Sequence, residues 1–465
     1  MKRRLATALL PLALLAQAPD AAPALKLKRD ALASDAAYKD LEYLCDRIGA
    51  RPSGSKQLDE AIAWAQAVMK REGFVNVRAE PVTIPVWKRG AERGWIEAPA
   101  HQTLSILGLG GTVPTPKGGL TAEVVVVASF DELKALGEAK VRGRIVVYDV
   151  PFTTYGATVA YRGRGASEAA KLGAVAALVR SVTPVSLDTP HTGAMNYAPD
   201  APKIPAAAIT LENATQLRRL QASGQTPRVH LELESEAPAE ALSANVVGEI
   251  PGSGKPEEIV VLGGHLDSWD VGQGAQDDGV GCMLALHAAA QIRRSGLTPR
   301  RTLRVVLFTN EEHGLAGGRA YLEAHRAELP RHAAMLETDS GNGLIQGFSL
   351  DLGGGQRRNR ELKAAVPTDA QVRALTLLNG LAPLVADLGA TKMELGGSGA
   401  DIGPTVAAGV AGLGVGHDAS RYWDVHHTRA DTFDKIKPED LKKNVAILSV
   451  FTFALADMAE RLDGK

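Results

Sequence analysis

Apolar positions follow two different rhythms in the C-terminal half of the chain, from Ser243 onward. Short runs of consecutive apolar residues alternate with longer stretches in which apolar residues recur every three or four positions. The first pattern predicts buried strands and the second predicts helices. We expect strands at 259–262, 302–309, 333–337 and 410–415, and helices at 280–294, 315–327, 368–388 and 438–461. This alternation predicts an α/β fold whose doubly wound, mostly parallel sheet is covered by helices on both faces.

The N-terminal part of the chain is mostly helical in pattern. Leu41, Leu44 and Ile48 recur at helical spacing until the run Arg-Pro-Ser-Gly at 51–54 interrupts them. A second helix is expected from 55 to 71, because a glycine follows shortly afterwards at position 73. Residues 80–115 predict a series of short strands.

The segment 117–237 differs from the chain on either side in its pattern of apolar residues. It contains short strand-like runs at 123–128, 143–150, 205–209 and 228–233. Prolines and glycines mark its start, and the run Glu-Ala-Pro-Ala-Glu marks its end. It contains no cluster of histidines and acids that suggests catalysis. We therefore expect an inserted β-rich domain at 117–237 between two parts of a catalytic domain, 25–116 and 238–465.

The first 24 residues have the pattern of a secretory signal peptide. Three basic residues at 2–4 precede an apolar run at 5–16, and small residues follow. This run is shorter than the roughly 20 residues that cross a bilayer, and a short membrane anchor is the alternative interpretation. We expect cleavage after Ala18 or, preferably, after Ala24. The mature protein should then be secreted or periplasmic, with no membrane segment.

Composition and charge exclude several classes of protein. Hydrophobic residues make up 45% of the 465 residues and charged residues 23%, which is typical of globular proteins rather than disordered ones. The formal net charge of −1 argues against nucleic acid as the main partner, because binding phosphates requires an excess of basic residues. The two cysteines, Cys45 and Cys282, are too few for a disulfide scaffold or a cysteine-based zinc site.

Histidines and acids gather just after the predicted strands of the C-terminal half. Ligands of open α/β sheets bind beyond the carboxyl ends of the strands, so these side chains should meet at one edge. Each group alone has an ordinary explanation, such as a helix cap or a solvated helix start. Their conjunction at successive strand ends favours a metal site. The groups are His265 with Asp267, Asp277 with Asp278, Glu311 with Glu312, Glu337 with Asp339, and His426 with His427.

Imidazole and carboxylate ligands without thiolate suit zinc, with cobalt or manganese as substitutes. Two histidines and three carboxylates are more than one tetrahedral zinc needs, and they suit two metals that share a bridging carboxylate. Such a pair can hold a hydroxide and polarise a carbonyl group. A carboxylate that is not a ligand must then carry the proton. The adjacent acids Glu311 and Glu312 fit this division, with one acting as ligand and the other as base.

Several motifs together resemble those of the di-zinc aminopeptidase-type metallopeptidases. The three that carry the family resemblance are Gly-Gly-His-Leu-Asp-Ser at 263–268, Gly-Ala-Gln-Asp-Asp-Gly-Val-Gly at 274–281 and Asn-Glu-Glu-His-Gly at 310–314. Four others are closer to the carboxypeptidase Q-like branch of that family: Met-Leu-Glu-Thr-Asp-Ser-Gly at 335–341, Gly-Ala-Asp-Ile at 399–402, Tyr-Trp-Asp-Val-His-His-Thr at 422–428 and Asp-Thr at 431–432. The resemblance covers most of 35–462. It implies the zinc exopeptidase fold, with the insertion as a protease-associated domain.

The resemblance also implies a role for each residue of the site. His265 and Asp339 would hold one zinc, Glu312 and His427 would hold the other, and Asp277 would bridge the two. Glu311 would be the general base and acid, and Asp267 would orient His265 by accepting its other N–H. A cis peptide bond would join Asp277 to Asp278.

Two of these assignments have a competitor close by in the sequence. Glu337 is the alternative to Asp339, and His426 is the alternative to His427. His417, Arg421 and Tyr422 precede the histidine pair in a loop that either lines the substrate pocket or packs only against itself.

These inferences predict an exported di-zinc exopeptidase that cleaves short peptides by metal-hydroxide attack. Dipeptides with free ends are the expected substrates, and the family branch implies a homodimer. A broader aminopeptidase of the same family is the first alternative. A binding receptor that has lost its metals and a single-zinc glutaminyl cyclase are alternatives from other classes.

Overall fold

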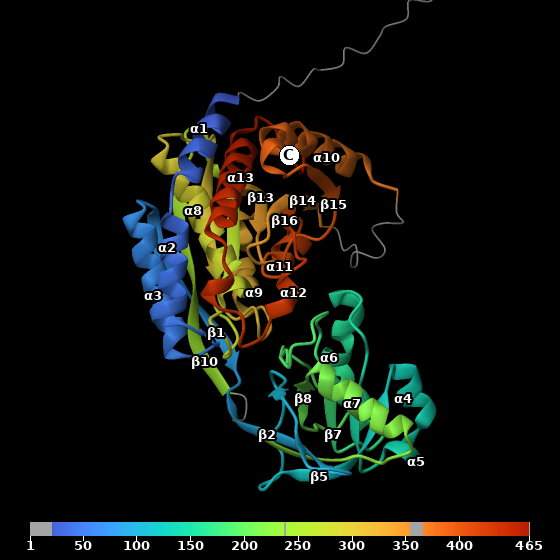
Figure 1. Ribbon diagram of the computed structural model, residues 1–465. Coiled ribbons are helices and arrows are strands. Elements are labelled where there is room, and N and C mark those ends of the chain that lie inside the picture. Colours follow the sequence, from blue (N-terminus) through green and yellow to red (C-terminus); the bar gives the residue numbers. More distant parts are fainter. Residues whose placement is uncertain (1–20, 237–238, 354–365, 465) are drawn as a thin grey trace, which may run out of the picture.

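The computed structural model describes residues 21–236, 239–353 and 366–464. They form two bodies, each built on an eight-stranded sheet. In Figure 1 the larger body lies above the smaller one, and extended strands run between them. The expected signal peptide falls mainly on 1–20, outside the described residues. Within the described residues, no helix is long and apolar enough to cross a membrane.

The larger sheet is parallel at its centre and mixed at its edges. Its strands lie in the order β1-β10-β12-β11-β13-β16-β14-β15, and β12, β11, β13 and β16 are mutually parallel. β1 and β10 add antiparallel strands at one edge, and β14 is antiparallel to β16. The strands are β1 (Val75–Val86), β10 (Ala239–Ile250), β11 (Lys255–His265), β12 (Arg301–Phe308), β13 (His332–Glu337), β14 (Ile345–Asp351), β15 (Lys392–Leu395) and β16 (Gly412–His417). The α/β prediction is therefore confirmed, and the parallel part is the centre of the sheet.

Helices cover both faces of this sheet, as the burial of β12 shows. Val305 and Leu307 pack into the core on one face, whereas Val306 and Phe308 pack into the core on the other. Alternate side chains of a strand point to opposite faces, so a central strand needs apolar residues at every position. The first face is covered by α1 (Ala21–Leu32), α2 (Ala36–Tyr43), α3 (Lys56–Arg71), α8 (Val280–Arg294), α10 (Asp369–Leu381) and α13 (Pro438–Asp457), and the second by α9 (Ala316–Ala324) and α11 (Gly403–Ala407).

Helix α8 has the same bounds in the structure as in the sequence-based prediction, 280–294. Every residue from Val280 to Ile292 is buried, which matches its almost uninterrupted apolar sequence. The helix expected at 368–388 instead ends as α10 at Leu381 and continues in two short 3₁₀ turns. Pro383 explains the break, because proline lacks the N–H that an α-helix needs.

The smaller body is an α/β unit with a sheet in the order β3-β2-β9-β5-β6-β7-β8-β4. Four helices accompany these strands in the described part of the unit, so it is less β-rich than the sequence pattern suggested. The strands are β2 (Arg89–Ala98), β3 (Gln102–Thr103), β4 (Ile106–Gly108), β5 (Leu120–Val127), β6 (Ile145–Tyr148), β7 (Ala176–Arg180), β8 (Ala206–Ile209) and β9 (Arg228–Ser235), and the helices are α4 (Phe130–Leu136), α5 (Glu138–Val141), α6 (Tyr155–Ala170) and α7 (Leu211–Ala222).

The smaller sheet begins earlier in the chain than the expected boundary at 117. Strand β2 pairs with β9 from Arg89 opposite Ser235 to Ala98 opposite Arg228. Strand β4 likewise closes the other edge of this sheet against β8. The segment 89–108 therefore belongs to the second unit. We call residues 89–236 the second unit from here on.

Candidate metal centre

The central parallel strands bring the predicted side chains to one edge of the larger sheet. His265 is the last residue of β11, and it pairs with Phe308, the last residue of β12. Glu337 ends β13 and pairs with Gly263. The turn that carries Glu311 and Glu312 therefore starts level with His265. Parallel pairing in register is the reason that residues more than forty positions apart in the sequence meet here.

Asp277 lies at the centre of the group. Its Oδ1 lies 3.2 Å from Nε2 of His265, and its Oδ2 lies 3.1 Å from Nε2 of His427. The two oxygens thus face imidazoles on opposite sides, which is the arrangement that a bridging carboxylate requires. Asp277 is buried, and a cis peptide bond joins it to Asp278.

Glu312 and His427 form one side of the centre. Oε2 of Glu312 lies 3.2 Å from Nε2 of His427 and also accepts a hydrogen bond from the indole N–H of Trp269. Nδ1 of His427 lies 3.2 Å from the backbone carbonyl of Thr192, so this ring is held from behind by the second unit. A carbonyl acceptor at Nδ1 leaves the lone pair of Nε2 free for a cation.

His265 and Asp339 form the other side. Oδ1 of Asp339 lies 3.9 Å from Nε2 of His265. Nδ1 of His265 lies 2.9 Å from the backbone carbonyl of Asp267 and 3.8 Å from its carboxylate. Asp267 therefore lies where it can orient the ring, and it does so through its backbone carbonyl. Its carboxylate instead accepts hydrogen bonds from the backbone N–H groups of Glu311 and Glu312, at 3.1 and 3.4 Å.

Several polar side-chain atoms of the centre are buried and have no hydrogen-bond partner in the described part of the chain. They are Nε2 of His265, Oδ2 of Asp277, Oε1 of Glu312 and Oδ1 of Asp339. Buried polar atoms normally find a partner, so several unpartnered ones on neighbouring histidines and acids suit a cation. Burial and the neighbouring Asp277 carboxylate raise the pKa of Asp339 to about 7. Crowded buried carboxylates of this kind are stabilised when metal ions supply positive charge.

Three sets of side chains in the described residues could hold a metal ion. One set consists of His265, Asp277 and Glu312. The second consists of Asp277 with the histidine pair 426–427, and the third of His265 with Asp278 and Asp339. The Asp278 carboxylate is already bonded to the backbone N–H groups of His265 and Gly281 at 3.0 Å. It therefore has less capacity for a cation than Asp277.

The two competing residues lie in different surroundings. The carboxylate of Glu337 accepts hydrogen bonds from the backbone N–H groups of Ala400, Asp401 and Ile402, and it is absent from all three sets. It thus organises the turn before α11. His426 stacks on His427 with ring centroids 3.5 Å apart, and its Nε2 lies 3.6 Å from Asp277, farther than that of His427.

Glu311 stands apart from these contacts. Its carboxylate forms no hydrogen bond or ion pair with the described residues and faces a cavity of about 380 Å³. Burial, with the nearby carboxylates of Glu312 and Asp339, raises the pKa of Glu311 well above its usual value. The same cavity is lined by Asp277, Glu312, Asp339 and His427.

Two residues without an assigned role in the sequence hold the loop that carries Asp277. The carboxylate of Asp431 accepts hydrogen bonds from the backbone N–H groups of Gln276 and Asp277, at 2.7 and 3.2 Å. The fully buried Arg51 donates to the carbonyls of Leu266 and Gly274 on either side of that loop. Both residues lie in runs that the sequence analysis noted, at 51–54 and 431–432. Their partners lie more than 150 positions away in the sequence, so the pattern gave no sign of these contacts.

Of the three residues noted in the loop before the histidine pair, one lines the cavity and two do not. Tyr422 lines the cavity. His417 instead bonds to Thr338 and to the carbonyl of Gly343, and Arg421 is exposed beside Asp424.

The second unit also contributes to the cavity. Arg162 and Tyr155 lie on α6, which is on the side of that unit nearest α12 (Tyr422–Val425) in Figure 1. The sequence gave no sign of this contribution, because the histidines and acids of the second unit form no cluster that suggests catalysis.

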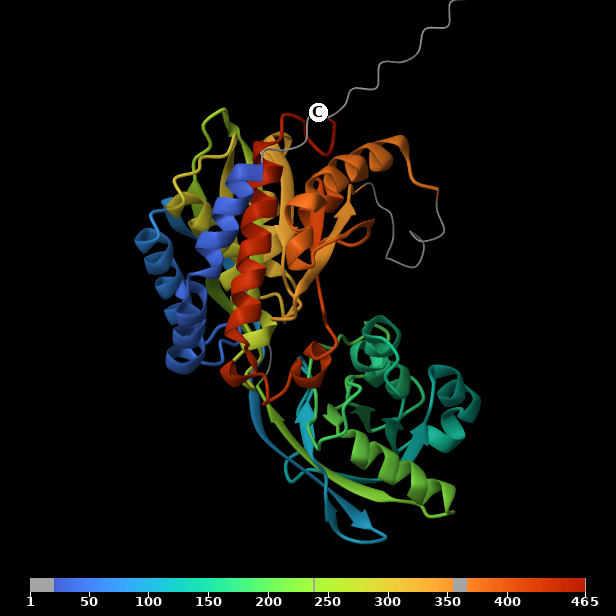
Figure 2. The same ribbon diagram turned by 45° about the horizontal axis from the view of Figure 1, so that its top comes forward.

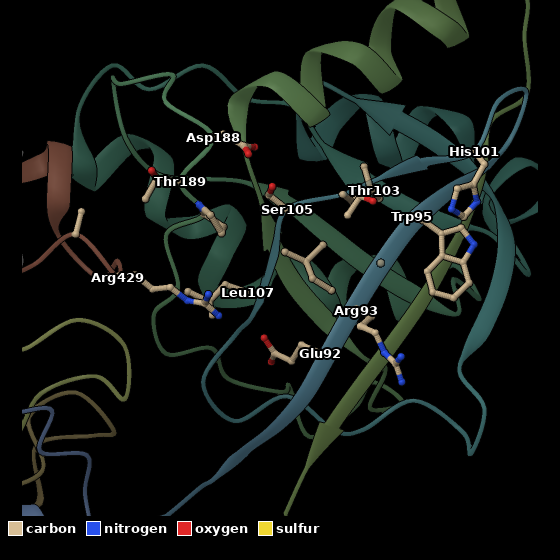
Figure 3. Close-up of a pocket in the computed structure, with 15 residues that line it drawn as sticks. Glu92, Arg93, Trp95, His101, Thr103, Ser105, Leu107, Asp188, Thr189 and Arg429 are labelled. Carbon is tan, nitrogen blue, oxygen red and sulfur yellow. The ribbon is translucent and has the colours of Figure 1, made fainter.

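A larger hollow of about 630 Å³ lies away from the metal centre, along β2 and the loop at 188–190 (Figure 3). Trp95 and His101 lie at one end and Arg429 at the other. The Glu92 carboxylate in its wall is engaged by Arg89 and by the backbone N–H of Gly108. None of the potential metal ligands lies in the lining of this hollow.

Comparisons with known proteins point to one family. The model of peptidase family M28 matches residues 245–452. Carboxypeptidase Q of Mus musculus is 41% identical over 425 residues, which cover 91% of this chain and 86% of the relative. The crystal structure of a peptidase M28 precursor from Shewanella amazonensis superposes with a TM-score of 0.88 at 35% identity, covering 94% of this chain and 97% of that one. A zinc aminopeptidase from Bacillus subtilis shares the fold, with a TM-score of 0.63, 19% identity, and coverage of 92% and 96%.

Proposed function

This chain belongs to peptidase family M28 and is a zinc metallopeptidase, and from that premise we propose that it is a di-zinc exopeptidase for short peptides, above all dipeptides with free termini. The observation that carries the proposal is the set of buried atoms on His265, Asp277, Glu312 and Asp339 that have no hydrogen-bond partner among the described residues and belong to groups that could hold a metal ion.

We assign His265 and Asp339 to one zinc, Glu312 and His427 to the other, and Asp277 to both. The two oxygens of Asp277 face the imidazoles of His265 and His427 at nearly equal distances, 3.2 and 3.1 Å, which supports a shared ligand. Zinc ions bound here would supply Lewis acidity, which activates water and polarises the scissile carbonyl.

Glu311 is the proton carrier in this proposal. Glu312 is engaged by His427 and Trp269, whereas the carboxylate of Glu311 is free in the cavity. Asp267 holds the backbone of both residues and so fixes where the two carboxylates point. Glu311 would accept a proton from the attacking water and deliver it to the leaving amine.

The size and walls of the cavity support small substrates. The larger body supplies the proposed ligands, and Tyr155 and Arg162 on α6 of the second unit also line the cavity. A cavity of about 380 Å³ is at the small end of the range for ligand pockets and suits a dipeptide better than a folded chain.

We further propose that the protein is exported. Cleavage after Ala24, the site preferred from the sequence, would remove the first turn of α1, in which Ala24 is buried, and this burial supports Ala18 as the cleavage site instead. The expected homodimer stays a prediction, and the elution volume of the purified protein on a sizing column tests it.

The decisive experiment is a panel of dipeptides, longer peptides and aminoacyl amides, assayed with and without a chelator, beside zinc counting by plasma emission. Glu311→Gln should retain two zinc ions per chain and lose about 10²–10⁴-fold in kcat, the usual contribution of general acid–base catalysis. The matched control is Glu60→Gln, the same change at an exposed position of α3.

Three outcomes separate the alternatives. Full activity of Glu311→Gln would remove it as proton carrier. One tightly held zinc per chain would favour the glutaminyl cyclase type. Binding of peptides without turnover by the zinc-loaded wild type would favour a receptor.

A further inference from the structure

Arg162 is unusual among the buried arginines of the described residues. Five arginines are buried there, namely Arg51, Arg162, Arg301, Arg304 and Arg461. Arg301, Arg304 and Arg461 each pair with a carboxylate. Arg51 has none but donates to four backbone carbonyls. Arg162 has neither arrangement, and it forms no ion pair within the described residues.

The hydrogen bonds of Arg162 leave part of its guanidinium unsatisfied. Nη1 donates to the backbone carbonyl of Thr192 at 3.3 Å, and Nη2 donates to the hydroxyl of Tyr155 at 2.7 Å. Nε is buried without a partner. A buried charge without a counter-ion is costly, so a side chain that is 7% exposed in this state suits an anion that arrives from the cavity.

The position of Arg162 relative to the metal centre defines which anion would reach it. Its Nη1 lies 3.4 Å from Nδ1 of His427, while Nε2 of the same ring faces Asp277 and Glu312. The guanidinium is thus one imidazole ring away from the space where the scissile carbonyl would be polarised. One residue of extended peptide spans about 3.5 Å, so a carboxylate one residue beyond the scissile bond falls within its range.

We propose that Arg162 binds the free α-carboxylate of the residue released from the C-terminus, and thereby selects dipeptides. This inference rests on the proposed peptidase function and deepens it. Guanidinium and carboxylate match each other in bidentate geometry, which a neutral amide cannot reproduce. A longer peptide places an uncharged amide at this point and gains no such contact.

Tyr155 holds the guanidinium in place. Its hydroxyl accepts the Nη2 hydrogen bond, and its ring stacks on Trp423 with centroids 4.6 Å apart. Trp423 belongs to the larger body, and its carbonyl accepts a hydrogen bond from Thr183 of the second unit at 2.7 Å. The carboxylate site therefore spans both units and depends on how they pack.

The test compares the zinc-loaded wild type with Arg162→Met on a dipeptide and on the same dipeptide as its C-terminal amide. The wild type should prefer the free acid, and Arg162→Met should raise KM for the acid about 10–100-fold with little change for the amide, as expected when a charged hydrogen bond is lost. Arg162→Lys should restore part of the preference. Arg164→Met is the matched control, because Arg164 is exposed on the same helix and lies over the ring of Phe130.

A binding measurement provides a readout other than turnover. In zinc-loaded Glu311→Gln, calorimetry should show that the acid binds more tightly than the amide and that adding Arg162→Met removes the difference. Equal losses for acid and amide, or a lower zinc content in Arg162→Met, would show that Arg162 only supports His427, and would overturn the inference. A dipeptide amide whose second residue is glutamate distinguishes the source of the carboxylate, since a preference that follows this side chain would overturn the α-carboxylate assignment. If the wild type cleaves no peptide, the proposed function fails, while the binding comparison still decides the role of Arg162.

Discussion

The two sides of the metal centre are built in different ways. His265 ends one strand and Asp339 follows an adjacent parallel strand of the same sheet, and the ring of His265 contacts the carbonyl of Asp267, two positions later, and the carboxylate of Asp277. His427 lies in a loop, has a positive φ of 60°, and is held by the carbonyl of Thr192 from another unit. One side thus depends on a single sheet, whereas the other depends on the packing of two units.

This difference separates chemistry from selectivity in the molecule. In the proposed function, residues on the larger body would bind and activate the scissile group whichever peptide is present. The second unit touches both His427 and the cavity through Thr192, Arg162 and Tyr155. A change in the second unit can therefore alter both the affinity for one zinc and the choice of substrate, while the His265 side is preserved.

Asp277→Asn should have the largest effect, because it removes the ligand that both sides share. We expect loss of both zinc ions and a fall in kcat/KM of more than about 10³-fold. Zinc counting and dipeptide assays check this, with Asp59→Asn on the exposed face of α3 as the control. Retention of two zinc ions with nearly full activity would contradict a bridging role.

Gly193→Ala should weaken zinc binding on the His427 side and leave it unchanged on the His265 side. Gly193 has a φ of +141°, which a residue with a side chain rarely adopts, and an added Cβ would lie 2.3 Å from Cζ of Arg162, so either the guanidinium of Arg162 or the backbone beside Thr192 must shift. We expect a 10–100-fold weaker affinity for one zinc, the range typical when a group that supports a ligand is lost. Stepwise zinc titration with a competing chelator measures both affinities. Gly163→Ala is the control, because a methyl group there meets no atom within 4 Å. Equal weakening of both zinc ions would contradict the comparison.

Asp40→Asn should leave zinc binding on both sides unchanged and should lower only the stability of the fold. Burial alone would raise the pKa of Asp40, but hydrogen bonds from His287 at 2.9 Å and Arg71 at 3.1 Å outweigh this and lower it. A carboxyl with a lowered pKa in the folded state stabilises the protein above its unfolded pKa of about 3.9, and this contribution is lost as the pH falls through the folded pKa. Asp40→Asn should cost about 1–2 kcal/mol at neutral pH and make stability less sensitive to acid. Urea unfolding at several pH values measures this, and an unchanged acid dependence would contradict it.

The positions after β11, β12 and β13 could be predicted from the sequence because local patterns and one general rule were sufficient. Apolar runs mark the strands, parallel strands place their ends together, and His265, Glu311 and Glu312 lie at or just after those ends. The boundary of the second unit could not be placed in the same way. Strand β2 could belong to either sheet by its own pattern, and only its pairing with β9, more than 100 positions away, decides the matter.

The roles of individual atoms were also beyond the sequence. It identified Asp267 as the residue that orients His265, but the backbone carbonyl does this, and the carboxylate holds the Glu311 turn. Trp269 and Asp431 lie within or next to motifs, yet nothing in their spacing indicates that they bond to Glu312 and to the loop of Asp277.

By itself, the sequence determined the α/β class, the edge of the sheet where chemistry gathers, and the residue types that favour zinc, because periodicity and ligand chemistry are local properties. Only the tertiary structure decided that Arg162 and Thr192 reach this edge from a separate unit, and that Arg162 does so without a counter-ion among the residues that the structure describes. Contacts of that kind depend on how two bodies pack. The free energy of this packing is spread over both surfaces, so the sequence of no single segment determines it.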